Sequence, residues 1–256
     1  MKSTRVRHHD VLAIGPRITV LPVIHGSADC ASEVRQRLMS GDFEAIAVPL
    51  PESFREPLEA AILDLPRPSL VVQEQGRVSE NDAPWNDARD READDDEQEA
   101  ERAFNFVPVD PCQPVIAALR GALEERLPRY YVDLETDCFV PYGQALPDPY
   151  ALKRMSLEQF AVGTLPALTR PTEHQRLRRI AHIGRRLRDL AIDHRSILLV
   201  CSLVDWPWIR EAYFRLGQEP DRSDEDGHPE TPVRREIDFS TLYFLLGELP
   251  FITSLH

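Results

Sequence analysis

The chain alternates between short apolar runs and segments in which apolar residues recur every three or four positions. The run 18–24 has the length of a strand and ends in a His-Gly-Ser turn. A helix-period segment follows, and a second apolar run, 43–48, comes next. Two strands joined through a helix are typical of a parallel βαβ unit. This geometry places His25, Ser27 and Asp29 at the carboxyl end of the first strand, where ligands bind in open α/β sheets.

The same alternation continues along the chain, so we predict one α/β domain over 17–216. Its central sheet is expected to be mostly parallel or mixed, with helices on both faces. Thr172 and Gln175 have the spacing of a capping box, which predicts a helix start at Thr172. Further strands are predicted at 69–72, 104–109, 129–134 and 197–201, and further helices at 51–62, 114–123, 149–168, 172–193 and from 206 onward.

Polar and charged stretches divide the rest of the chain. The segment 76–102 interrupts the domain, and within it Glu80 to Glu101 holds eleven acidic residues against two arginines, or −9 of the net charge of −13. We expect this insert to be a disordered, solvated loop; docking of a protein partner or binding of cations is the alternative. Residues 1–16 are expected to form an N-terminal extension and 217–236 a polar loop. The apolar end of 237–256 is consistent with a truncated chain or a docked terminal segment.

Charge and hydropathy exclude several classes of partner. Without the insert the chain is only mildly acidic, and it lacks the clustered Lys and Arg that nucleic acid requires. The helix predicted after Thr172 carries Arg178, Arg179, Arg185 and Arg186, but acidic residues interrupt this stripe, so a solvated or loop-docked face is the preferred interpretation. No apolar run reaches membrane-spanning length, and the amino terminus has no apolar core of a signal peptide. Four cysteines without CxxC spacing fit reduced thiols, so a cytoplasmic protein is expected.

A second strand end carries a pair of carboxylates. Asp133 and Glu135 occupy alternate positions in Val-Asp-Leu-Glu, so their side chains point the same way from an extended backbone. Paired carboxylates hold divalent cations or separate two pKa values for acid and base catalysis. Capping of a turn or helix by Asp133 is the alternative.

A third carboxylate, Asp205, follows the strand predicted at 197–201. Together with His25, Asp133 and Glu135 it would form a mixed nitrogen and oxygen site suited to manganese, iron or zinc. In that hypothesis a metal-bound water attacks an ester or amide of a small molecule or peptide. The alternative is that Asp205 caps the helix that begins beside Pro207.

Three other residues enter the catalytic hypotheses. Arg120 and Arg154 are candidates to bind an anionic group of a substrate. Ser27 is an alternative nucleophile with His25 as its base, but the chain has no Gly-x-Ser-x-Gly elbow.

Several partial motifs recur in the order seen in one known superfamily. The chain resembles the TraB, Tiki, ChaN and erythromycin-esterase-like superfamily, over most of residues 17–215. The resemblance implies an α/β fold and a relation to metal-dependent peptidases, esterases and haem-binding proteins. The matching segments are Pro22-Val-Ile-His25, Glu33-Val-Arg35, Val48-Pro49-Leu50, Ala117-Ala-Leu-Arg-Gly-Ala-Leu123, Tyr131-Val-Asp133-Leu134, Arg185-Arg-Leu-Arg-Asp189 and Val200-Cys-Ser-Leu-Val-Asp205.

The chain departs from the family pattern at functional positions. Pro22 stands where the family has glycine, Pro49 where it has glutamate and Asp205 where it has histidine, while His25 is retained. Two hypotheses follow: a divergent metal-assisted hydrolase, or a catalytically inactive scaffold that binds a protein partner through the cleft or the acidic insert. The hydrolase requires His25 and Asp205 to lie on adjacent strand ends, with facing side chains close enough to hold one ion.

Overall fold

The computed structural model describes residues 11–75, 104–136, 138–140, 142, 145–215 and 230–238. The whole of the acidic insert predicted at 76–102 lies outside these residues. So do most of the N-terminal extension and of the C-terminal segment, and those predictions stay untested.

The main sheet has five strands in the order β1-β2-β7-β3-β6. Its members are β1 (Ala13–Ile14), β2 (Ile18–Val23), β7 (Ile197–Ser202), β3 (Ala45–Val48) and β6 (Arg129–Tyr131). The four strands β2, β7, β3 and β6 are mutually parallel, and only β1 runs antiparallel. The predicted α/β fold with a mostly parallel sheet is therefore confirmed.

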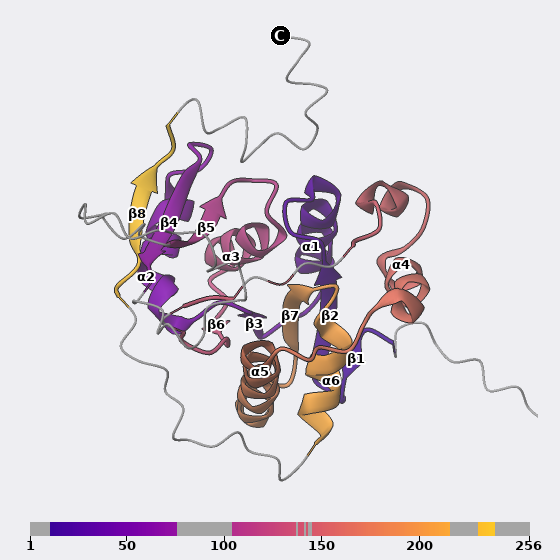
Figure 1. Cartoon of the computed structure of the whole chain (residues 1–256). Coiled ribbons are helices and arrows are strands. Elements are labelled where there is room, and N and C mark those ends of the chain that lie inside the picture. The colour runs from indigo at the N-terminus through magenta and orange to yellow at the C-terminus, as the bar shows by residue number, and fades with distance from the viewer. Residues whose placement is uncertain are drawn as a thin grey trace, which may run out of the picture.

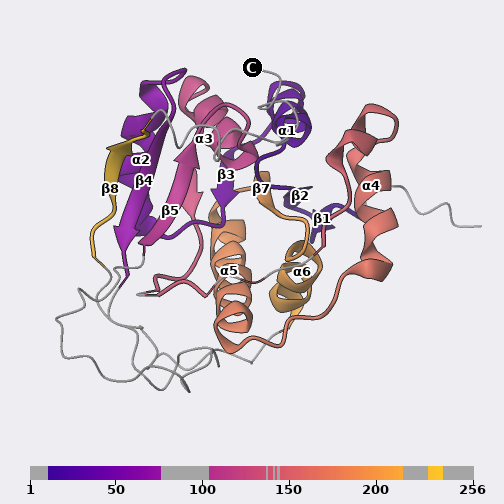
Figure 2. The ribbon, with the colours of Figure 1, turned by 45° about the horizontal axis from the view of Figure 1, so that its top comes forward.

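Two pairs of helices cover the main sheet (Figures 1 and 2). On one side α1 (Ala28–Ser40) packs against α3 (Pro114–Glu124), and on the other α5 (His174–Asp193) packs against α6 (Trp206–Phe214). Gly184 allows α5 and α6 to approach closely, because a Cβ there would lie only 2.9 Å from the Cβ of Ala212. The sheet and these helices enclose the hydrophobic core.

A second, antiparallel sheet lies beside the first (Figure 2). Its order is β5-β4-β8, with β5 (Phe104–Val109), β4 (Ser69–Glu74) and β8 (Val233–Glu236). The helix α2 (Arg55–Leu63), which follows the short 3-10 helix η2 (Glu52–Phe54), packs against all three strands. The sequence predicts a loop over 217–236, whereas 233–236 form β8. β8 was missed because its Val-Arg-Arg-Glu sequence has almost no apolar pattern and depends on pairing with β4.

The segment predicted to be helical at 149–168 does contain helices. It contains η3 (Pro149–Lys153), α4 (Leu157–Thr164) and η4 (Leu165–Ala167). A capping box is present here rather than at Thr172: the Ser156 hydroxyl oxygen accepts a hydrogen bond from the backbone amide of Gln159, and the side-chain oxygen of Gln159 accepts one from the backbone amide of Ser156. The N-cap of α5 is Glu173, whose side chain makes no capping bond, so the predicted box at Thr172 is corrected.

β7 is the best-buried strand. It lies between β2 and β3, with both faces covered by helices, and its first five residues are completely buried. None of the described helices combines the length and apolar character needed to cross a bilayer.

Replacing a core residue of β7 tests this architecture. Leu199 pairs with Val20 and Ala47 and is fully buried, so Leu199→Ala is expected to lower the free energy of unfolding by about 2–5 kcal/mol. The matched control is Leu63→Ala, at a leucine that is 75% exposed, with an expected change of about 0.5 kcal/mol or less. Urea denaturation measures both. Equal losses in the two variants would contradict the central position of β7.

Candidate functional site

The carboxyl ends of the four parallel strands meet at one edge of the main sheet. Hydrogen bonds continue the strand pairing past the assigned ends: the Leu203 amide donates to Val23 at 2.8 Å, and the Asp133 amide donates to Leu50 at 3.1 Å. His25 follows β2, Asp133 follows β6 and Asp205 follows β7. The adjacency of β2 and β7 meets one part of the condition for a shared ion, that His25 and Asp205 follow neighbouring strands. The other part, facing side chains close enough for one ion, stays a prediction.

Asp133 is held by an arginine of α5. Its side chain is 1% exposed, and it accepts hydrogen bonds from Nε and Nη2 of Arg179. Burial works to lower the pKa of Arg179, but the charge and hydrogen bonds of Asp133 outweigh it and raise the pKa. The Arg179 guanidinium also lies over the ring of Phe139, 4.7 Å from its centroid. This carboxylate and its arginine form a buried, closely matched ion pair.

Asp205 is held by a second arginine, one turn earlier on the same helix. Oδ1 accepts from Nε of Arg176 at 2.9 Å, and Oδ2 accepts from the hydroxyl of Tyr142. The Tyr142 ring lies 3.8 Å from the Arg176 guanidinium, and burial together with the Asp205 charge raises the pKa of the tyrosine. Although Asp205 occupies the N-cap position of α6, its side chain makes no capping bond, because both oxygens are used elsewhere.

His25 differs from the carboxylates in being open to solvent. It follows Ile24 and precedes Gly26, whose φ of +77° suits glycine and whose amide donates to Oε1 of Gln113 at 2.9 Å. Neither ring nitrogen of His25 is hydrogen-bonded within the described residues. Desolvation by the surrounding protein lowers the pKa of His25, the charge of Asp205 opposes this and the charge of Arg179 adds to it, so the neutral imidazole is favoured.

Two adjoining cavities open at this edge and share His25, Pro49, Phe139 and Arg179. The smaller, of about 290 Å³, is lined by Arg176, Tyr142 and Asp205 on its polar side and by Ile180, Ile183 and Val204 on its apolar side. The larger, of about 670 Å³, extends toward the second sheet between β5 and the loops after β3 and β6. Cavities of this size at the carboxyl edge of an α/β sheet are typical of sites for organic ligands.

Glu135 does not join this cluster. It accepts hydrogen bonds from the backbone amide and the hydroxyl of Ser53, each at 2.8 Å, and so caps the start of η2. Ser27 also has a capping role: its hydroxyl accepts from the amide of Cys30 at the start of α1, and the residue is 5% exposed. A buried capping hydroxyl is poorly placed to act as a nucleophile.

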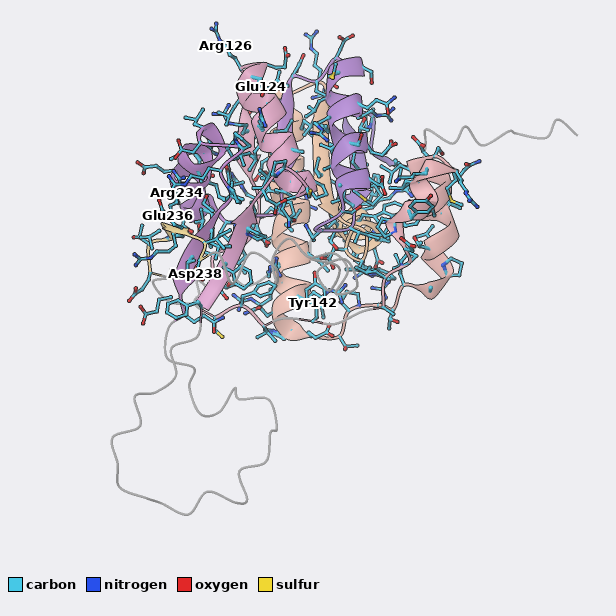
Figure 3. The ribbon with its side chains drawn as sticks, turned by 90° about the horizontal axis from the view of Figure 1, so that it is seen from above. Glu124, Arg126, Tyr142, Arg234, Glu236 and Asp238 are labelled. Carbon is cyan, nitrogen blue, oxygen red and sulfur yellow. The ribbon has the colours of Figure 1, made fainter. Side chains whose placement is uncertain are left out.

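The two predicted substrate arginines lie elsewhere. Arg120 forms an exposed ion pair with Glu124 on α3, and Figure 3 shows Glu124 at the opposite end of the molecule from Tyr142. Arg154 is an exposed residue that follows η3. Neither lines the two cavities.

The arginines that do line the site were present in the sequence but were assigned differently. The sequence predicts a solvated or loop-docked stripe that includes Arg179 and gives no role to Arg176, yet both side chains bond to carboxylates at the sheet edge. The helical periodicity of α5 could have indicated the inward position of Arg176, because this residue lies on the same face as the buried Ile180, Ile183 and Leu187. Phe139 and Tyr142 lie outside any helix or strand, so no periodic pattern marked them.

The donor set does not fit the manganese, iron or zinc ion suggested by the sequence. The oxygens of Asp133 and Asp205 accept bonds from Arg179, Arg176 and Tyr142, so the arginines already neutralise the negative charge that would attract a cation. Throughout the described ranges, no three His, Cys, Asp or Glu side chains are grouped so that they could hold a metal ion.

Comparison with known proteins adds no relative: no protein-family model, no curated protein and no solved structure matches the chain. The resemblance to the TraB and erythromycin-esterase-like superfamily therefore stays a prediction.

The buried pair between Asp133 and Arg179 has a measurable effect on stability. Asp133→Asn leaves a largely buried guanidinium uncompensated and is expected to cost about 3–5 kcal/mol of unfolding free energy. Asp64→Asn is the matched control, because Asp64 pairs with Arg234 but is 53% exposed, and it should cost about 1 kcal/mol or less. Urea denaturation gives both values, and a loss at Asp133 no greater than at Asp64 would show that the buried pair is not stabilising.

Proposed function

We propose that the protein binds an organic ligand at the carboxyl edge of its main sheet, against His25 and without a resident metal ion. The observation that carries this proposal is that both cavity carboxylates, Asp133 and Asp205, are committed to arginines of α5. The site thus offers little net charge of its own. A neutral, accessible imidazole and the guanidinium edges supply its polar contacts.

The form of the cavities supports a ligand with a polar group and a larger apolar part. Arg179 lines both cavities, and its Nη1 group donates to no acceptor within the described residues. A carbonyl or carboxylate oxygen of the ligand is a suitable acceptor for it. Phe54, Phe104 and Phe106 give the larger cavity an aromatic lining that accommodates apolar groups.

Fragment binding tests this proposal. In ligand-observed NMR with a library of small aromatic acids and amides, we expect fragments that bind the wild type and bind at least tenfold more weakly to His25→Gln, because a loss of about 1.4 kcal/mol corresponds to tenfold. His174→Gln is the matched control, since His174 is exposed at the start of α5. If no fragment in the library binds in a way that depends on His25, the proposal is overturned.

The metal-free part of the proposal has its own measurement. Manganese, iron(II) or zinc added to the purified protein should give no saturable shift in melting temperature beyond that of the His25→Gln variant. A stabilisation that saturates at one ion per chain and disappears in both His25→Gln and Asp205→Asn would instead support the metal site suggested by the sequence.

Hydrolysis is the second candidate, favoured by the state of His25. A neutral imidazole can accept a proton from water that attacks an ester or amide, and the nearby Asp205 carboxylate would stabilise the resulting imidazolium. This candidate keeps the hydrolase expectation from the sequence while dispensing with the metal. Ligand binding without catalysis is the first candidate in this proposal, because it needs only the cavity and its contacts.

A pH profile distinguishes the two candidates. If His25 is a general base, ester hydrolysis should be constant near neutral pH and decline only below pH 6.5, because the lowered pKa keeps the imidazole unprotonated down to that range. His25→Gln should then reduce the rate by about 10²–10⁴-fold. A panel of nitrophenyl esters measures both effects. Hydrolysis that is absent, or equal in His25→Gln and His174→Gln, would leave only the binding function.

A further inference from the structure

The larger cavity runs along a strand edge. Five consecutive residues of β5, Phe104 to Pro108, line it. Side chains of a strand alternate between its two faces, so consecutive residues border one cavity only when the cavity follows the edge of the strand. One edge of β5 pairs with β4, and within the described residues the other edge pairs with no strand. The cavity therefore lies along the open edge of β5.

Pro108 indicates which main-chain groups face the cavity. Proline has no N–H to give to a neighbouring strand, so in sheets its nitrogen faces away from the paired side. Residues opposite one another in an antiparallel pair alternate between bonded and non-bonded positions. Phe104 and Phe106 have the same phase as Pro108, so their N–H and C=O groups point toward the open edge. Within the described part of the chain no strand pairs with these groups, which match the main chain of an extended peptide.

Side chains on both faces of β5 complete the groove. Phe104 and Phe106 are 49% and 54% exposed on one face, and Asn105 and Val107 lie on the other. In a peptide strand added at this edge, every second side chain would lie against Phe104 and Phe106. The side chains between them would lie beside Asn105, whose amide bonds to Gln73. A compact ligand would use one of these faces, whereas an extended chain uses both.

Charge restricts the peptide further. The chain that connects β4 to β5 holds the eleven acidic residues between Glu80 and Glu101, and this stretch is joined almost directly to Phe104. The negative charge of this stretch of chain favours a ligand that carries basic groups. The complementary ligand is thus an apolar, extended segment with lysine or arginine beside it.

We propose that the open edge of β5 binds an extended peptide segment with alternating apolar side chains and basic flanks, by addition of a strand to the second sheet. This inference rests on the proposed function, because the peptide would occupy the larger of the two cavities at His25. It names the ligand class and the mode of binding, in which main-chain hydrogen bonds supply affinity and the phenylalanines supply selectivity.

A synthetic peptide tests the strand addition directly. The probe is a fluorescein-labelled, end-capped heptapeptide, Lys-Val-Thr-Val-Thr-Val-Lys, titrated with the full-length protein by fluorescence anisotropy. Two further versions carry N-methyl groups either on the valines or on the threonines. Only one set of amides faces β5, so one methylated version should bind about tenfold or more weakly than the parent, and the other should bind as the parent does.

Protein variants show where the peptide binds. Phe106→Ser should weaken binding about tenfold, while Phe214→Ser, at a phenylalanine that is 56% exposed on α6, should leave it unchanged. The proposal would be overturned if both methylated peptides bind equally, if the two substitutions have equal effects, or if the parent peptide does not bind at about 1 mM protein. Peptide binding that disappears as protein concentration rises would also overturn it, by assigning the edge to a second copy of the chain.

The fragment experiment separates this inference from the proposed function. If fragments bind in a His25-dependent way but the peptides do not bind, strand addition is refuted and the proposed ligand site stands. If neither fragments nor peptides bind, both the proposed function and the strand addition are refuted.

Discussion

Two carboxylates at the edge of a buried sheet have to be neutralised, and the arrangement of the site follows from how this is done. Asp133 and Asp205 come from strand ends on either side of β3, and a buried anion is costly unless it is paired. Arg179 and Arg176 supply the partners from successive turns of α5. The helix is thereby fixed against the strand ends, and aromatic side chains of the 134–148 segment pack on the same two guanidinium groups.

This pairing determines what chemistry is left for a ligand. With the carboxylates engaged, His25 is an accessible polar group of the site, and its surroundings favour the uncharged imidazole. A neutral histidine, guanidinium edges and an aromatic wall suit an organic ligand better than a free cation. The larger cavity continues from His25 along the edge of β5, where main-chain groups line it. The site therefore combines a polar region at His25 with a longer groove.

The sequence was sufficient for the elements that depend on local pattern. The apolar runs predicted β2, β3 and β7, and the order of strands and helices predicted a mostly parallel sheet with His25, Asp133 and Asp205 at one edge. This worked because parallel strands that are buried on both faces are continuous apolar runs, and their ends carry the polar residues.

The rest depended on contacts between distant segments. β8 has almost no apolar pattern and exists through its pairing with β4. Glu135 was expected beside Asp133, but it caps η2 instead, some eighty residues earlier in the chain. Arg176 and Arg179 illustrate a different difficulty: an arginine on a surface helix is usually solvated, and only the position of the two carboxylates shows that these two turn inward.

The central claim, that Asp133 is committed to Arg179, is tested most directly by a double-mutant cycle on this pair. Unfolding free energies of the wild type, Asp133→Asn, Arg179→Met and the double variant give the coupling energy between the two side chains. We predict a favourable coupling of at least about 1.5 kcal/mol, unchanged when zinc or a chelator is added. A coupling below about 0.5 kcal/mol, or one that appears only in the presence of metal, would contradict the claim.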